Sequence, residues 1–254
     1  MNFFTSEENF KESCGYDIDG KWYPRVTKIV EIKAKPALYM FYGAAKSYKA
    51  AQDVAKLSAT EGTKVHEAVE KILLGEAPEV APDIKPSIDA FELFLSSNSL
   101  QVNKELVERR VHHKDHRYAG TVDLIALFNG KFGVMDIKTS QAIYRDYNLQ
   151  TSAYMEALLP DFPTLQTRWI LRIDQVKNCY ICGATMRPKG GNNKIRKGRM
   201  SLCAEDQHEW SDLQGATELQ EFPYWKNDFS AFLSAKKLWE WENEGWLKKV
   251  GYLS

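Results

Sequence analysis

Two aspartates and a lysine stand within the apolar runs of residues 120–140, GTVDLIALFNGKFGVMDIKTS. The central Asn-Gly pair predicts a tight turn between antiparallel strands, so that Asp123 comes beside Asp136. Because side chains alternate along a strand, Asp136 and Lys138 project from the same face. Neighbouring carboxylates in a half-buried site repel each other, and a divalent cation such as Mg²⁺ removes that cost. Beside such an ion, Lys138 can orient or help deprotonate a water for attack on phosphorus, or neutralise charge in the transition state.

Exposed aspartates with a simple ion pair to the lysine would give the same local pattern, so the rest of the chain decides. Four motifs follow one another: G-T-x-x-H at Gly62, Thr63 and His66, G-x-x-D at Gly120 and Asp123, D-x-K at Asp136 and Lys138, and Q-x-x-x-Y at Gln150 and Tyr154. In this order, on helix, strand, strand and helix, they resemble the PD-(D/E)XK nuclease superfamily, in the RecB-like exonuclease branch that includes phage-type and CRISPR-associated nucleases. The resemblance covers residues 24–175, with Val122 in place of a nominal proline and Asp136 where many members have glutamate.

The resemblance implies an α/β fold with a restriction-endonuclease-like core, in which helices flank a central mixed sheet. It implies a Mg²⁺- or Mn²⁺-dependent deoxyribonuclease, by preference an exonuclease that leaves a 5′-phosphate. DNA is then the substrate, in recombination, repair, phage or CRISPR DNA processing, with a recombination, helicase or CRISPR-adaptation protein as partner. Two alternatives stay open: a nucleic-acid-binding module that uses the core as a scaffold, and a subunit with little activity without a helicase.

By the same resemblance, Asp123, Asp136 and the carbonyl of Ile137 hold the catalytic metal. His66 is a further implied ligand, although a lone histidine on a helix is more often structural. Lys138 serves the attacking water in this scheme.

Glu108 is the expected additional acidic ligand, and Glu105 is its competitor. Strand parity places the two on opposite faces, so only one of them can point into the site. Gln150 and Tyr154 are four residues apart and share a helix face. They belong either to an ordinary helix surface or, as the resemblance implies, to a polar pair that steadies the lysine or the DNA strand.

A second possible metal site lies in residues 177–215, which carry Cys179, Cys182, Cys203 and His208. A Cys-x-x-Cys-Gly knuckle presents two thiolates to one ion, and a distant second half completes a tetrahedral zinc site. Such a site lets a polar segment with little core fold. The alternatives are no metal, or an iron–sulfur cluster as in some RecB-like nucleases, with Cys14 as its first ligand. We rank the cluster below zinc because Cys182 and Cys203 are farther apart than in those enzymes.

The same segment contains a basic run, RPKGGNNKIRKGR, without an acidic residue. Its cations are Arg187, Lys189, Lys194, Arg196, Lys197 and Arg199. A solvated loop and a phosphate contact are both open interpretations.

The elements that must position these groups follow from periodicity and turn residues. Helices are predicted over residues 36–57, 60–75 with Thr60 as N-cap, 87–98, 144–159 and 227–249. Strands are predicted over residues 104–113, 118–128, 131–139, 167–176 and 217–222, the last of which pairs with residues 167–173. We therefore expect a nuclease domain from residues 1–176 and 216–254, with residues 177–215 as a cysteine-containing insertion.

Composition restricts the function less than the motifs do. The 254 residues carry 34 basic and 34 acidic side chains, so net charge argues neither for nor against nucleic acid. No apolar run is long enough to span a membrane, and the N-terminal sequence does not resemble a signal peptide. We expect a cytoplasmic protein of a bacterial, archaeal or phage-infected cell, with its cysteines reduced or bound to metal.

Overall fold

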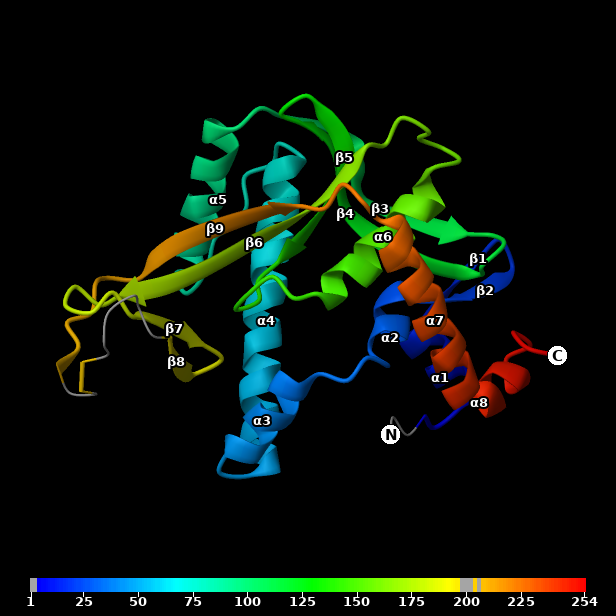
Figure 1. Cartoon of the computed structure of the whole chain (residues 1–254), viewed down its shortest axis with the longest axis horizontal. Helices are drawn as coiled ribbons and strands as arrows, with labels where there is room; N and C mark the ends of the chain where they lie inside the picture. Colours follow the sequence, from blue (N-terminus) through cyan, green and yellow to red (C-terminus); the bar gives the residue numbers. More distant parts are fainter. Residues whose placement is uncertain (1–3, 197–202, 205–206) are drawn as a thin grey trace.

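A central mixed sheet between two layers of helices forms the α/β fold of the computed structural model, which describes residues 4–196, 203–204 and 207–254 (Figure 1). The strands are β1 (Gly15–Ile18), β2 (Lys21–Pro24), β3 (Leu100–His113), β4 (Tyr118–Phe128), β5 (Lys131–Lys138), β6 (Thr167–Asn178), β7 (Thr185–Lys189), β8 (Asn192–Arg196) and β9 (Gln214–Glu221). The helices are α1 (Glu7–Cys14), α2 (Val26–Val30), α3 (Pro36–Ala44), α4 (Tyr48–Leu73), α5 (Lys85–Ser97), α6 (Asp146–Leu158), α7 (Lys226–Glu242) and α8 (Glu244–Lys249).

The central strands lie in the residue ranges that the sequence predicts. β3, β4 and β5 form an antiparallel meander, and α6 then carries the chain to β6, which lies parallel to β5. β9 pairs antiparallel with β6, as predicted. Asn129 and Gly130 join β4 to β5 with φ of 46° and 81°, the left-handed conformations that this pair favours in a hairpin turn. The turn fixes the register of the two strands that carry Asp123 and Asp136.

Each face of the sheet has its own hydrophobic core. On one face, α4 and α5 contribute Val69 and Phe91 to a core that includes Leu124 and Trp169 of the sheet. On the other, the core unites residues of α1, α2, α6, α7 and α8, among them the buried Phe232. The helices that carry His66 and Gln150 therefore cover opposite faces.

Helix boundaries differ from the prediction at two places. Thr60 is not an N-cap, because α4 runs through it and its hydroxyl donates to the Lys56 carbonyl. The cap is Ser47, whose hydroxyl accepts from the Ala50 amide at 3.1 Å, as serine does at this position. The predicted last helix is divided into α7 and α8 at Asn243, whose side chain donates to the Trp239 carbonyl.

The cysteine-containing segment leaves the central sheet at the end of β6 and returns at the start of β9. Its β7–β8 hairpin extends from β6 through the pairs Lys177–Met186 and Asn178–Thr185. In the part of the chain that the structure describes, no helix has the length and apolar composition needed to cross a membrane.

Candidate functional site

Asp123 and Asp136 lie beside each other in the sheet, because the pairing of Leu124 with Met135 sets them on adjacent strands in register. Asp136 is fully buried and Asp123 is half-buried. Burial raises the pKa of both carboxyls, and that of Asp136 reaches about 6 although Lys138 opposes the shift. The Asp123 carboxylate accepts a hydrogen bond from the Ile137 amide at 2.6 Å. This pair of acids is therefore costly to ionise without a cation.

Lys138 supplies one such cation within the protein. Its Nζ lies 2.5 Å from Asp136 Oδ2, and the ring of Tyr147 faces it with a centroid distance of 5.2 Å. Burial alone would lower the pKa of this lysine, but Asp136 and Asp123 outweigh burial and raise it. The side chain is therefore an ammonium that donates hydrogen bonds.

Gln150 and Tyr154 of α6 belong to the same constellation. Gln150 Nε2 donates to Asp136 Oδ1 at 2.9 Å and to the Tyr154 hydroxyl at 3.2 Å. Tyr154 packs against β4 at Gly120, where a Cβ would stand 2.4 Å from its ring. The glycine of the G-x-x-D motif thus makes room for the tyrosine of the Q-x-x-x-Y motif.

A group of three possible metal ligands lies at this end of the sheet. One ligand atom from each of His66, Glu108 and Asp123 lies within 4.8 Å of the others. Burial lowers the pKa of His66, with Lys138 acting in the same direction, which favours the neutral imidazole that binds metals. Burial and then the charge of Asp123 raise the pKa of Glu108 to about 7.

Glu108 reaches this group from an irregular position in β3. Its φ of 47° is uncommon for a residue other than glycine, and the β3–β4 register shifts between Val102 and Val107. The competitor Glu105 lies within that irregular stretch and is exposed. Left-handed backbone at a potential ligand is a form of strain that often accompanies functional sites.

Asp136 and Ile137, the other two predicted metal ligands, lie next to this group and make contacts within the protein. The Asp136 carboxylate is directed at Lys138 and Gln150, and Asp136 is not among the three clustered ligands. Ile137 contributes its backbone amide to Asp123. One imidazole nitrogen and two carboxylates form a donor set that suits Mn²⁺ at least as well as Mg²⁺, and they leave coordination positions open for water and phosphate.

The second potential metal site unites Cys179, Cys182, Cys203 and His208, with one ligand atom from each within 4.8 Å of the others. Cys182 Sγ lies 3.6 Å from His208 Nδ1. Burial opposes ionisation of Cys179, but hydrogen bonds from the Cys182 backbone and the His208 side chain lower its pKa to about 6. Three sulfurs and one imidazole nitrogen this close together could serve as the four ligands of a tetrahedral zinc ion.

Local backbone contacts shape this cysteine site. Gly183 turns the chain with φ of 69°, and its amide donates to the Cys179 carbonyl. The His208 ring stacks on Trp210 with a centroid distance of 4.6 Å. Cys14, the last residue of α1, is buried in the core of one sheet face and does not belong to the cluster of the other three cysteines, which argues against the alternative of an iron–sulfur cluster with Cys14 as its first ligand.

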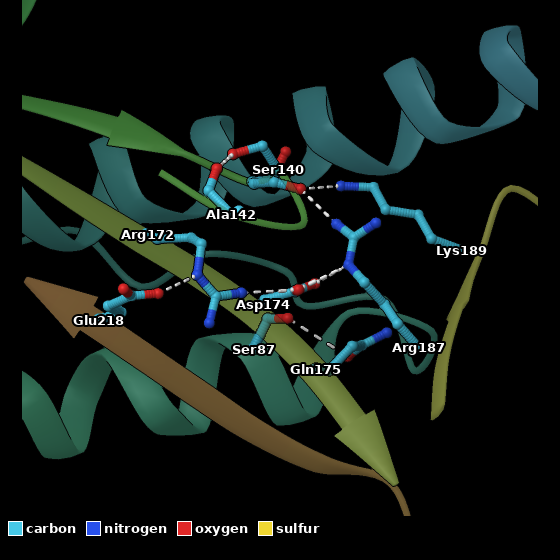
Figure 2. A network of polar contacts seen from close by, with 10 residues as sticks. Ser87, Ser140, Ala142, Arg172, Asp174, Gln175, Arg187, Lys189 and Glu218 are labelled. Carbon is cyan, nitrogen blue, oxygen red and sulfur yellow. Dashed lines mark hydrogen bonds and ion pairs between the residues drawn. The ribbon is translucent and has the colours of Figure 1, made fainter. Parts of the chain in front are cut away.

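The basic run divides into inward and outward side chains. Arg187 forms an ion pair with Asp174 and donates to the Thr139 carbonyl at 2.6 Å (Figure 2). Lys189 donates to the same carbonyl at 2.5 Å. Lys194 and Arg196 are exposed instead, and Lys197 and Arg199 lie outside the described residues. Two of the six predicted phosphate contacts are therefore occupied within the protein.

Lys194 and Arg196 line a cavity of about 130 Å³ together with Arg172. Arg172 pairs in the parallel register with Lys138, so one residue of the cavity lining is the strand neighbour of the lysine. Asp174 lies among the cations, and Arg172 also donates to Glu218 at 2.8 Å. Sequence analysis missed Arg172, because its position depends on the β5–β6 register, for which no local pattern exists.

Thr139 is held between α4 and the β7–β8 hairpin. Gly62 of α4 leaves room for the Thr139 hydroxyl, which a Cβ would approach to 2.8 Å. On α4 as well, Glu61 accepts a hydrogen bond from the Gly190 amide at 2.9 Å. The cysteine-containing segment thereby touches the residue that follows Lys138.

Comparison of the sequence with protein-family models and with curated proteins finds no match. The function therefore has to be inferred from the geometry. That geometry consists of a histidine–carboxylate group beside a buried lysine, and a separate cluster of three cysteines and a histidine.

Proposed function

We propose that the protein is a Mn²⁺- or Mg²⁺-dependent deoxyribonuclease of the PD-(D/E)XK type, related to RecB-like exonucleases. The observation that carries this proposal is the joint placement of the three clustered ligands, His66, Glu108 and Asp123, beside the Lys138–Asp136 ion pair. A structural ion pair alone would not require a neighbouring imidazole and two further acids. We infer exonuclease action that leaves a 5′-phosphate from the resemblance of the motif order.

The clustered ligands would bind the ion, which when bound polarises a phosphate and acidifies a water. Lys138 is protonated and would donate to the attacking water or to a phosphate oxygen, which stabilises developing negative charge. Gln150 fixes Asp136, and Asp136 in turn orients Lys138. Tyr154 supports Gln150 from the buried side.

The remaining features fit a nucleic-acid substrate. Lys194 and Arg196 are exposed beside the site and offer contacts to phosphates. The cysteine cluster would hold a structural zinc ion, which shapes the segment that carries these cations.

A nucleic-acid-binding module is the second candidate function. The observation in its favour is that Asp136 is already satisfied by Lys138 and Gln150, so a purely structural role also accounts for these three side chains. A subunit that works with a helicase, a recombination protein or a CRISPR-adaptation protein would show the same behaviour in isolation. Binding without cleavage would support either version.

The test is cleavage of end-labelled linear and closed-circular DNA in Mg²⁺ and in Mn²⁺. Lys138→Ala and Asp123→Asn are compared with matched exposed controls, Lys131→Ala and Asp115→Asn. We expect loss of linear DNA with wild type and both controls, and a rate lower by at least about 10³-fold for the two site variants. Cleavage of the circle would indicate an endonuclease. If wild type binds DNA but does not cleave it, the nucleic-acid-binding module becomes the favoured function.

A further inference from the structure

The segment of residues 33–49, which we call the α3 wing, exposes apolar side chains. Figure 1 shows α3 at the end of α4, away from the sheet. Tyr39, Met40 and Tyr48 are 64%, 75% and 68% exposed, although such residues are normally covered. Several large exposed side chains on one short segment are a reason to look for a binding partner there.

The charge of the wing narrows the choice of partner. Residues 32–52 contain four lysines and no aspartate or glutamate, in a chain whose net charge is zero. Lys33, Lys35, Lys46 and Lys49 are all exposed. A partner with regularly spaced negative charges complements this surface.

The aromatic rings supply a second recognition element. Tyr42 and Tyr48 stack with a centroid distance of 5.4 Å and an interplanar angle of 25°. Tyr48 is nevertheless largely exposed, so the pair forms a platform that another flat ring can extend. Aromatic platforms combined with cations are the means by which proteins bind single-stranded nucleic acid, since every base has a face that stacks.

The wing is continuous with the candidate active site along α4. Gly190, at the turn of the β7–β8 hairpin, packs against Ser58, and the exposed cations Lys194 and Arg196 follow on β8. His66 lies about two turns beyond Ser58 on the same helix. From Tyr48 to His66 the helix rises about 27 Å, which a stacked strand would span with about eight nucleotides.

We propose that the α3 wing binds a single-stranded tract of DNA whose neighbouring phosphates follow α4 to the carboxylate site. The juxtaposition that carries the proposal is an acid-free lysine segment, an exposed tyrosine platform and the helix that leads from them to His66. The second half of the proposal, delivery to the carboxylate site, rests on the proposed nuclease function. Binding by the wing itself does not.

The test measures binding of fluorescein-labelled oligothymidylates of 20 and 6 nucleotides to the full chain without added Mg²⁺ or Mn²⁺. Tyr39→Ala/Tyr48→Ala removes two exposed rings, and Tyr39→Phe/Tyr48→Phe keeps them. Tyr224→Ala is the matched control, since Tyr224 is 89% exposed and lies outside the wing. We expect the alanine pair to weaken binding of the 20-mer by at least about tenfold, and the phenylalanine pair and the control to change it less than about twofold.

The 6-mer is too short to reach from the wing to the carboxylate site, so one molecule of it cannot contact both regions at once. In cleavage assays with metal, the alanine pair should slow digestion of the 20-mer by a similar factor. A Lys35→Gln/Lys46→Gln/Lys49→Gln variant should reduce the slope of log affinity against log salt by about 2.

Unchanged binding of the 20-mer by the alanine pair would overturn the proposal. The proposal would also be overturned if the alanine pair kept its DNA binding but lost binding to phosphatidylserine vesicles, or lost self-association in sedimentation. Failure of the nuclease function has a different signature, because wild type would then cleave nothing in Mg²⁺ or Mn²⁺ while its binding results stand.

Discussion

In the carboxylate site, the ligands come from α4, β3 and β4, elements that the two hydrophobic cores of the sheet hold in place. In the cysteine site, the ligands come from a segment whose buried core, among its described residues, is formed by Cys179, Cys182 and Ala184, with Cys203 and Trp210 packed against them. In the first site, like charges lie on a scaffold whose hydrophobic cores hold it together without an ion. The second contains so little apolar material that an ion would have to build the scaffold.

This contrast separates two uses of a metal. At the carboxylate site, an ion relieves repulsion between acids and supplies chemistry, so its removal should affect reactivity and leave the fold intact. At the cysteine site, an ion replaces missing apolar burial, so its removal should affect structure first.

Removal of the cysteine ligands should disorder the segment around them. Cys179→Ser/Cys182→Ser is expected to abolish zinc binding, whose apparent free energy in small domains is about 10 kcal/mol or more. Hydrogen exchange should then become fast in residues 179–196, while β4 and β5 stay protected. Metal analysis of the purified wild type should find one zinc per chain. Slow hydrogen exchange in the variant would show that the segment does not need an ion in order to fold.

Removal of one acid from the carboxylate site should have the opposite pattern. Asp123→Asn can still accept from the Ile137 amide but no longer adds negative charge beside Asp136. We expect cleavage to fall by at least about 10³-fold, or about 4 kcal/mol, while the metal-free protein becomes more stable by about 1 kcal/mol. Thermal unfolding at pH 8 without metal should show a Tm about 3 °C higher than wild type. A lower Tm would mean that Asp123 is a structural acid.

Proton competition should distinguish the carboxylate site by its pH range. The pKa of Asp136 is raised to about 6 and that of Glu108 to about 7, so protons occupy these groups below neutral pH. The charged groups that face Glu108 are Asp123 of β4, Glu70 of α4, and Asp136 and Lys138 of β5. Because an ion must displace the proton, Mn²⁺ affinity should fall roughly tenfold per pH unit as pH decreases through this range.

Calorimetric titration of Mn²⁺ between pH 5.5 and 8.5 measures this dependence. Glu108→Gln should weaken binding at pH 8 and remove the inflection near pH 7. An affinity that is constant over the range would show that these carboxyls do not bind the ion.

The smallest expected effect tests how separate the two regions are. A Cβ at Gly190 would stand 2.2 Å from the Ser58 hydroxyl and 2.5 Å from the Val54 carbonyl, so Gly190→Ala should loosen the hairpin from α4. Gly191→Ala is the matched control, because Gly191 has a φ of 74°, close to the 61° of Gly190, but its Cβ would meet only Leu57 Cδ1 at 4.0 Å, an ordinary contact. We expect kcat to fall a few-fold for Gly190→Ala beyond any effect of the control, with Mn²⁺ affinity unchanged. Equal kcat values would show that the hairpin does not influence Lys138.

The sequence predicts the part of the site that depends on local rules. The Asn129-Gly130 turn sets the β4–β5 register, and strand alternation then brings Asp123, Asp136 and Lys138 together. The four-residue spacing places Gln150 and Tyr154 on one helix face, where they contact each other. Hydrophobic periodicity also identifies the segments that form β3, β4, β5, β6 and β9.

The parts that escaped prediction depend on contacts between distant residues. Arg172 neighbours Lys138 through a parallel pairing that no turn specifies. Glu108 is predicted as a ligand, but its left-handed φ of 47° and the register shift between Val102 and Val107 just before it are not written in the alternation of side chains. Thr60 has a residue type that often begins helices, but the surrounding chain continues the helix, and Ser47 holds the cap.

The antiparallel pairing of β6 with β9 extends to Val176 and Gln214, so the cysteine-containing segment departs and returns on neighbouring strands. A turn of a few residues could join these two points without altering any strand of the central sheet, because loop length between antiparallel neighbours is thermodynamically inexpensive. The segment is thus a module that protein design could exchange. What an exchange would remove is the pair of donors to Thr139, so a shortened chain would keep the ligands of the carboxylate site and lose the brace next to its lysine.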